Sequence, residues 1–307
     1  MSLRDLLLLV VALPALLVGG AIAMGVQIPV PHWGREYVVR LAVGAEAQPI
    51  DLPAILGPDD PDRPLVVIDA GHGGRDPGSV GPGVQEKEIV LAIALKLRDL
   101  LLEQGGIRVA MTRVDDRIVV LADRPEIARQ LDADLFLSIH ADSAGDMNSV
   151  SGASIYTLSN EASSEAAALF AARENNADRL NGVEIEGASN EVSAILVELS
   201  QGRTQESATE FAQLIAREGE GRIVFHPSAL RSAGLAVLRA PDVPGVLFES
   251  GFVTNREDRA RLTTEEGRDE YAAVLARAIR VYFARRADVD APFPASTEGA
   301  STGAPTP

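Results

Sequence analysis

The chain has 307 residues, of which 46% are apolar, and this is enough for one domain with a sizeable core plus flanking segments. Its net charge is −16, and its 28 basic residues form no cluster that would follow a phosphate backbone. This composition argues against nucleic acid as a partner. The chain has no cysteine, which excludes disulfides and limits any zinc site to histidine and carboxylate ligands.

The chain begins with an apolar run from Leu6 to Val26 that follows one early arginine. The run and the sequence Ala21-Ile22-Ala23, which has small residues at its first and third positions, are typical of a secretory signal with its cleavage site. A run of about 20 residues can also span a bilayer, so residues 6–26 are alternatively an uncleaved membrane anchor. We favour cleavage, and either interpretation of residues 1–26 predicts export to the periplasm or cell envelope.

Two further segments are predicted to lie outside the folded domain. Residues 27–63 read as a linker that contains a possible strand at residues 35–43 and the breaker-rich sequence GPDDPDRP. Residues 287–307 are rich in Pro, Ser, Thr, Gly and Ala, which predicts a disordered tail. The folded domain is therefore expected at residues 64–286.

From Pro64 onward, apolar strand-like runs alternate with helical periods. The first half of the domain reads LVVID, EKEIVLAIALKLRDLLLEQ, IRVAMTR, DRPEIARQL, LFLSIHA and GASIYTL. The second half contains the helical sequence SATEFAQLIAREG, the segment LAVLRA, the strand VLFES and a final helix from Thr264. This alternation predicts a single α/β domain with a mixed, mostly parallel sheet flanked by helices.

The segment at residues 158–202 is longer than a loop without secondary structure usually is in a compact domain. Ser164 is a good N-cap for a helix within SSEAAALFAARENNADRL. EVSAILVELSQ, at residues 191–201, predicts a second helix. The segment is therefore expected to form a helical insert.

Side chains that can bind metals or carry protons lie where elements begin or end. His72 follows the first strand in a glycine-rich turn, His140 ends LFLSIH, and Glu249 ends VLFE. Ligands collect at the carboxyl ends of strands in α/β sheets. Glu86 and Glu88 lie in the first turn of the first helix, and either could join the two histidines. Two histidines and a carboxylate are a known ligand set for hydrolytic zinc.

Taken singly, each of these residues has an ordinary structural interpretation. A histidine after a strand commonly makes turn hydrogen bonds, Glu86 would be favourable near the helix dipole, and Glu249 could form a salt bridge. The chain has only four histidines, however, and two of them hold equivalent positions at strand ends. His32 and His226 lie beside prolines and are predicted at the surface or rim. A phosphate-binding turn is disfavoured because GHGGRDPG lacks the P-loop ending.

Seven sequence words of this domain, in their order and spacing, resemble the zinc-dependent N-acetylmuramoyl-L-alanine amidases that act on bacterial cell walls. The words are IDAGHGGRDPGSVG, QEKEIVLAIALKLRDLL, TRVDDRIVVLADRPEIA, ADLFLSIHAD, SGASIYTLS, ARENNAD and AGLAVLRAPDVPGVLFESGFVTN. The resemblance is most specific at the two histidine words and the glutamate word.

The resemblance implies that His72, Glu86 and His140 bind Zn²⁺, with Glu86 preferred to Glu88 because the acid of the family directly precedes a lysine. It also implies that Glu249 is the catalytic acid and base. The reaction would be hydrolysis of the amide between the lactyl group of N-acetylmuramic acid and L-alanine of the peptidoglycan stem peptide. Its role would be cell-wall remodelling and daughter-cell separation.

The insert at residues 158–202 is similar to a regulatory segment of some family members, in which a helix covers the site and donates an acid to zinc. This likeness implies that Glu174 is an inhibitory extra ligand, although a solvated helix face is the alternative. In the family such helices are displaced by a divisome activator of the LytM type, which implies a protein partner. Members with the insert often carry a wall-targeting domain, and a membrane anchor at residues 6–26 would take its place here.

Two other functions are compatible with the same residues. The first is another zinc hydrolase, such as a deacetylase or carboxypeptidase, because the ligand set does not fix the bond that is cut. The second is a non-enzymatic peptidoglycan-binding or scaffold/activator protein with a degenerate zinc site. Asn255, Arg231 and Arg239 are candidates for the lining of a substrate groove, and structural roles are equally open for them.

Overall fold

The computed structural model describes residues 50–177 and 194–290. The predicted signal or anchor, the predicted strand at residues 35–43 and the tail beyond residue 290 lie outside this part of the chain. Within the part described, no helix is both long and apolar enough to cross a membrane.

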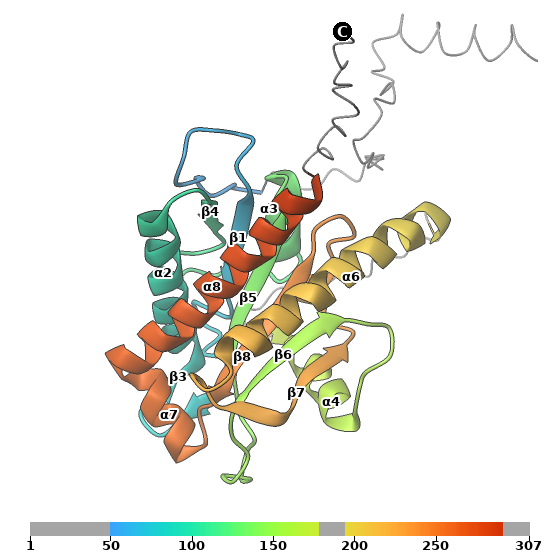
Figure 1. Ribbon diagram of the computed structural model, residues 1–307. Helices are drawn as coiled ribbons and strands as arrows, with labels where there is room; N and C mark the ends of the chain where they lie inside the picture. The colour runs from blue at the N-terminus through green and yellow to red at the C-terminus, as the bar shows by residue number, and fades with distance from the viewer. Residues whose placement is uncertain (1–49, 178–193, 291–307) are drawn as a thin grey trace, which may run out of the picture. The chain divides into compact units, whose positions relative to one another are not determined.

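Strands and helices alternate through most of the described chain (Figure 1). The strands are β1 (Leu65–Ala70), β2 (Val80–Gly81), β3 (Val84–Gln85), β4 (Arg108–Met111), β5 (Leu135–Asp142), β6 (Ala153–Leu158), β7 (Phe225–Ala233) and β8 (Gly245–Phe252). The helices are α2 (Glu86–Gln104), α3 (Asp123–Gln130), α4 (Glu165–Glu174), α6 (Ala194–Gly219), the 3₁₀ helix η1 (Ala236–Leu238), α7 (Arg256–Thr263) and α8 (Glu265–Asp290).

The main sheet has six strands in the order β4-β1-β5-β8-β6-β7. β4, β1, β5 and β8 are parallel, β6 is antiparallel to β8, and β7 is parallel to β6. This confirms the predicted mixed, mostly parallel sheet. The carboxyl ends of β1, β5 and β8 therefore lie together on one side of the sheet, where these strands end. The amino end of β6 lies on the same side.

Helices cover both faces of the sheet. Core residues of α2, α6 and α8 pack with Ile139 of β5 and Phe248 of β8 on one face. Core residues of α3 and α4 pack with Phe136 of β5 on the other face. Successive side chains of a strand point to opposite faces. His140 and Glu249, which alternate with Ile139 and Phe248, therefore point to the face that α4 covers.

The edge of the sheet at β4 is covered by the end of the predicted linker. Leu56 forms an antiparallel bridge with Val109, with N–O distances of 2.8 and 2.9 Å in the two directions. Pairing of this kind protects an edge strand from association with other chains.

The sequence predicted two separate helices, at residues 191–201 and 207–219. The prediction that they are separate is wrong. α6 is continuous from Ala194 to Gly219, so Gly202 does not end a helix. A glycine inside a helix costs only about 1 kcal/mol relative to alanine. The packing of Phe211 and Ile215 in the core outweighs that cost.

Four other elements differ from the sequence prediction. β7 was not predicted, and Pro227 explains why, since proline is tolerated only in edge strands such as this one. The segment LAVLRA contains η1, and the short α7 precedes the final helix. α8 continues to Asp290, so it includes the first residues of the predicted tail.

Candidate metal and active site

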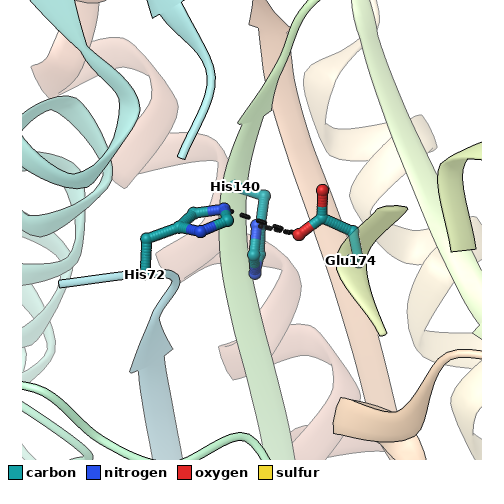
Figure 2. A group of neighbouring side chains, drawn as sticks. All are labelled: His72, His140 and Glu174. Carbon is teal, nitrogen blue, oxygen red and sulfur yellow. Dashed lines mark ion pairs between the residues drawn. The ribbon is translucent and has the colours of Figure 1, made fainter. Parts of the chain in front are cut away.

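Four polar side chains converge at the edge of the sheet where β1 and β5 end. His72 follows β1, His140 lies in β5, Glu86 begins α2, and Glu174 ends α4. All four are buried. In Figure 2 the rings of His72 and His140 and the carboxylate of Glu174 point toward one another. Sequence elements that are far apart thus bring two imidazoles and two carboxylates to one point.

The distances between these groups suit a tetrahedral metal ion. Nε2 of His72 lies 3.1 Å from Oε1 of Glu86 and 3.4 Å from Oε2 of Glu174. Nδ1 of His140 lies 3.0 and 3.5 Å from the same two oxygens. Ligand atoms at about 2.0–2.1 Å from zinc in a tetrahedron are about 3.3 Å apart. The four nitrogen–oxygen distances lie close to this value.

Three further observations support a metal at this position. His72, His140 and Glu174 form a buried group that could hold an ion, with ligand atoms within 4.8 Å of one another. Although Nε2 of His72 is close to Glu86, it makes no hydrogen bond of acceptable geometry with any described residue. The three residues also line a cavity of about 20 Å³, which has room for one water-sized group. The donor set therefore fits a metal such as zinc.

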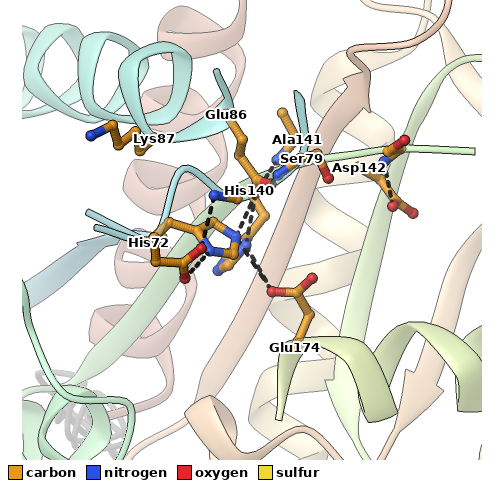
Figure 3. Close-up of polar contacts among 12 residues, drawn as sticks. His72, Ser79, Glu86, Lys87, His140, Ala141, Asp142 and Glu174 are labelled. Carbon is orange, nitrogen blue, oxygen red and sulfur yellow. Dashed lines mark hydrogen bonds and ion pairs between the residues drawn. The ribbon is translucent and has the colours of Figure 1, made fainter. Parts of the chain in front are cut away.

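Glu86 is fixed in place by backbone groups. Its Oε1 accepts a hydrogen bond from the Ala141 amide at 2.9 Å, and its Oε2 accepts one from the Ser79 amide at 2.7 Å. Figure 3 shows its carboxylate reaching from the first residue of α2 to the histidines. Burial would raise the pKa of Glu86, but the charges and hydrogen bonds of His72 and His140 hold it well below its usual value. Glu88, the alternative on the same helix, is exposed.

The turn that carries His72 is strained and tightly packed. His72 has a φ of 59°, a left-handed conformation that costs a non-glycine residue about 1–3 kcal/mol. Its Nδ1 lies 2.7 Å from Oδ2 of Asp76, which orients the ring so that Nε2 faces the cluster. A Cβ on Gly71 would lie 2.4 Å from the His140 ring, so this position requires glycine.

Glu249 lies beside His140 in the sheet and is paired in register with it. The side chain is buried, and neither carboxylate oxygen has a hydrogen-bond partner among the described residues. Burial raises the pKa of Glu249 well above its usual value, and the Asp142 and Glu86 carboxylates raise it further. A carboxyl group that takes up a proton readily is suited to general acid and base catalysis.

Contacts on both sides of Glu174 hold α4 over this site. Nη2 of Arg173 lies 2.6 Å from Oδ1 of Asp142. The Asn175 side chain donates to the Gly234 carbonyl at 2.8 Å and accepts from the Ala236 amide at 2.7 Å. The position of Glu174 near the histidines is therefore set by its two neighbours along the chain.

Comparison with known proteins identifies the family. The sequence profile of the N-acetylmuramoyl-L-alanine amidase family matches residues 66–281. The chain belongs to this family. The chain is 37% identical over 221 residues to the N-acetylmuramoyl-L-alanine amidase AmiA of Salmonella typhimurium, a match that covers 71% of the chain and 76% of AmiA. It is 36% identical over 225 residues to AmiC of Escherichia coli O6:H1, which covers 73% of the chain and 54% of AmiC. The chain thus spans only about half the length of AmiC.

Solved structures of the same family share the fold. The amidase AmiC2 of Nostoc punctiforme superposes with a TM-score of 0.51 at 29% identity, covering 73% of this chain and 98% of AmiC2. The CwlD amidase of Clostridioides difficile, solved with the GerS lipoprotein, has a TM-score of 0.54 at 23% identity, and the match covers 72% of this chain and 99% of CwlD. The CwlD likeness supports the fold alone.

The other residues singled out in the sequence lie outside this cluster. His226 is half-buried, and its Nδ1 accepts from the Ser228 amide at 3.0 Å. Arg231 donates to the Tyr156 hydroxyl at 3.0 Å. Asn255 caps α7 and lines an open cavity of about 590 Å³, whereas Arg239 is exposed beyond η1. Hydrogen bonds already occupy Arg231 and Asn255 in structural roles.

Three residues around the candidate site were not found from the sequence. Asp76 lies in the same glycine-rich word as His72, so its spacing was a usable signal. Asp142 and Arg173 pair across 31 positions of the chain. No local pattern predicts a contact of that kind.

Asp69 is expected to be a large contributor to the stability of this protein. It is fully buried and accepts hydrogen bonds from Thr112, Ser138 and Arg124 at 2.6–2.7 Å. Asp69→Ala would leave the charge of buried Arg124 without its carboxylate, which should lower the free energy of unfolding by about 3–5 kcal/mol. Chemical denaturation of the metal-free protein measures this.

The matched control is Asp116→Ala, which removes an exposed carboxylate from its ion pair with Lys87. A partly exposed pair of this kind contributes about 0–1 kcal/mol. If Asp69→Ala changed the stability as little as the control does, the structural role assigned to Asp69 would be wrong.

Proposed function

We propose that this chain hydrolyses the amide bond between the lactyl group of N-acetylmuramic acid and L-alanine of the peptidoglycan stem peptide. The observation that carries the proposal is the convergence of His72, Glu86 and His140 beside the buried carboxyl group of Glu249, in a chain of the amidase family. The same residues would serve another zinc hydrolase, but the family match favours the amide of the stem peptide.

His72, Glu86 and His140 would hold Zn²⁺. When bound, zinc lowers the pKa of a water molecule to about 7 and polarises a carbonyl group. Asp76 keeps the His72 ring oriented through its bond to Nδ1, and the Ala141 and Ser79 amides keep the Glu86 carboxylate in place. These partners hold the three ligand groups in position before substrate arrives.

Glu249 would carry the proton in both directions. As a base it accepts a proton from the water that attacks the lactyl carbonyl. As an acid it returns that proton to the nitrogen of L-alanine when the carbon–nitrogen bond breaks. The raised pKa of Glu249 favours the second step, because the carboxyl group then holds its proton until the amine needs it. The products are a free stem peptide and glycan without it.

Glu174 would be an inhibitory ligand. Catalytic zinc keeps one position open, whereas structural zinc has four protein ligands. Oε2 of Glu174 lies as close to both histidines as a fourth ligand would. With α4 in this place the position that water or substrate needs is filled, so activity would require α4 to move away. An activator of the LytM type is proposed as the partner that moves it, on the likeness of the insert to the regulatory segment of the family.

The setting of the reaction follows from its substrate. Peptidoglycan lies outside the cytoplasm, so residues 1–26 would direct export, either as a cleaved signal or as an anchor. The role that best fits such an activity is cell-wall remodelling and daughter-cell separation.

The test is to incubate the purified protein with peptidoglycan and identify released products by mass spectrometry. We expect stem peptides with a free amino-terminal L-alanine from wild-type or Glu174→Ala protein. A chelator should abolish the release, and added Zn²⁺ should restore it. The point variant is preferable to deletion of residues 158–202, which would also remove the start of α6. Folded, zinc-loaded protein that releases nothing in either form would favour the binding or scaffold function.

A further inference from the structure

Two buried arginines stand behind the turn that carries His72. Arg113 is 0% exposed and Arg124 is 5% exposed. Both lie in the sequence TRVDDRIVVLADRPEIA, which the proposed function leaves without a role. Buried cations are rare unless they are well paired, so their partners indicate what they do.

The guanidinium group of Arg113 bonds to backbone carbonyls. Nε donates to the Ala70 carbonyl at 2.8 Å, and Nη2 donates to the carbonyls of Gly71 at 2.7 Å and Lys87 at 2.9 Å. Gly71 directly precedes His72, and Lys87 directly follows Glu86. A single guanidinium group thus connects the chain beside one proposed metal ligand to the chain beside another.

Arg124 completes the contact with the turn. Nη1 lies 2.7 Å from Oδ1 of Asp69 and donates to the Ala70 carbonyl at 2.9 Å. Nη2 donates to the carbonyl of His72 itself at 2.9 Å. The carbonyls of three consecutive residues, Ala70, Gly71 and His72, are therefore all bound by the two arginines.

The shape of the guanidinium group matters here more than its charge. A planar fork with five donors can bond several carbonyls at fixed angles, which the single ammonium group of lysine cannot do. The charge itself is unfavourable, because burial and the neighbouring Arg124 lower the pKa of Arg113 to about 10. The positive charge of the guanidinium group would also repel a metal ion bound at the site. A role in holding geometry explains why arginine stands here in spite of these costs.

We propose that Arg113, together with Arg124, is a positioning residue for the metal site. The two side chains hold the left-handed His72 turn, and Arg113 also fixes its separation from the first turn of α2, so that His72 and Glu86 reach the same ion. This inference rests on the proposed function, because it assumes that these two residues bind zinc.

The test is the zinc affinity of Arg113→Lys in the full chain, measured by competition with a chromophoric chelator. Lysine keeps the positive charge, so the variant isolates the loss of the fork. We expect the Kd for zinc to rise at least about tenfold, as is found when groups that orient metal ligands are removed. The absorption spectrum of Co²⁺-loaded protein should change as well, since it reports the geometry of the ligands directly.

The matched control is Arg117→Lys. Arg117 is an exposed arginine on the same loop, and its side chain bonds only the Thr112 carbonyl among the hydrogen bonds of the described residues. The Kd of this variant for zinc should stay within about twofold of wild type, because the Arg117 side chain donates no hydrogen bond to either ligand turn. Unfolding of the metal-free variants, measured in parallel, separates a loss of affinity from a loss of folded protein.

The outcomes are distinct. A Kd for Arg113→Lys within twofold of wild type, or a lower one, would overturn the inference. If Arg113→Lys does not fold, the same criterion applied to Arg124→Lys decides. If the wild-type protein binds zinc and the arginine variants bind it with the same Kd, this inference alone is overturned. Wild-type protein that binds no zinc overturns the proposed metal site and this inference with it.

Discussion

Glu249→Gln is expected to lower kcat for release of stem peptides by about 10²–10⁴-fold, the usual contribution of a positioned general acid and base. Glutamine has the same size but cannot take up or return a proton. Because Glu249 touches neither histidine in the hydrogen bonds of the described residues, zinc binding should be unchanged. Turnover is measured in the Glu174→Ala background, where the site is open, and zinc content is measured beside it.

The control for this substitution is Glu88→Gln, an exposed carboxylate on α2 that should leave kcat unchanged. A Glu249→Gln protein that keeps more than about a tenth of the reference activity would contradict the proton-transfer role. Loss of zinc from that variant would instead indicate that Glu249 acts on the ligands.

The stability of the same variant in metal-free form gives a second readout. The pKa of Glu249 is raised on folding by burial and by neighbouring carboxylates, so the unfolded chain gives up this proton first as pH rises. Protonated Glu249 therefore makes its whole contribution to the free energy of unfolding below the ordinary glutamate pKa. That contribution is lost as the pH rises toward the pKa of Glu249 in the folded protein. Glutamine has no such loss. The variant should therefore gain stability relative to wild type as the pH is raised from 4 to 8, and a constant difference would show that Glu249 is not perturbed.

The sequence predicted the elements whose pattern is local. α2 occupies Glu86–Gln104 as the apolar period indicated, and the ends of β1, β5 and β8 lie where hydrophobic runs give way to polar side chains. Parallel strands bring their carboxyl ends to one edge, so His72, His140 and Glu249 could be expected there together. Glu86 could be expected near these residues for the same reason, because a helix that follows β1 begins on the side of the sheet where β1 ends.

What the sequence did not predict depends on tertiary contacts. The chain gives no sign that α6 passes through Gly202 without a break, because the compensation comes from Phe211 and Ile215 in the core. β7 is masked by Pro227, which only an edge position tolerates. The role of Arg113 is likewise invisible, because its partners are backbone carbonyls that no side-chain pattern reveals.

Glu174→Ala is expected to raise the basal rate of stem-peptide release by about 10–100-fold without any activator. A hydrogen bond to a charged group contributes about 1.5–3 kcal/mol, and we take this range for the contact of the Glu174 carboxylate at the metal site. Loss of the contact should increase the fraction of molecules with an open metal site by the corresponding factor. Arg173 and Asn175 still hold α4 in this variant, so the effect reports the carboxylate alone. Product release is measured on purified peptidoglycan with equal zinc loading.

The control is Glu165→Ala, which removes an exposed acid from the first turn of the same helix and should leave the rate unchanged. The sign of the Glu174 effect also decides which carboxylate completes the catalytic metal site, because His72 and His140 lie within ligand distance of both Glu86 and Glu174. If Glu86 is the third ligand, Glu174 only blocks, and its removal increases activity. If Glu174 were the third ligand, its removal would lower both zinc affinity and activity, and inhibition by α4 would have to be abandoned. Glu86 lies 3.0–3.1 Å and Glu174 3.4–3.5 Å from the two histidines, and both distances suit a metal ligand, so the direction of this change is what separates a ligand that catalysis requires from one that prevents it.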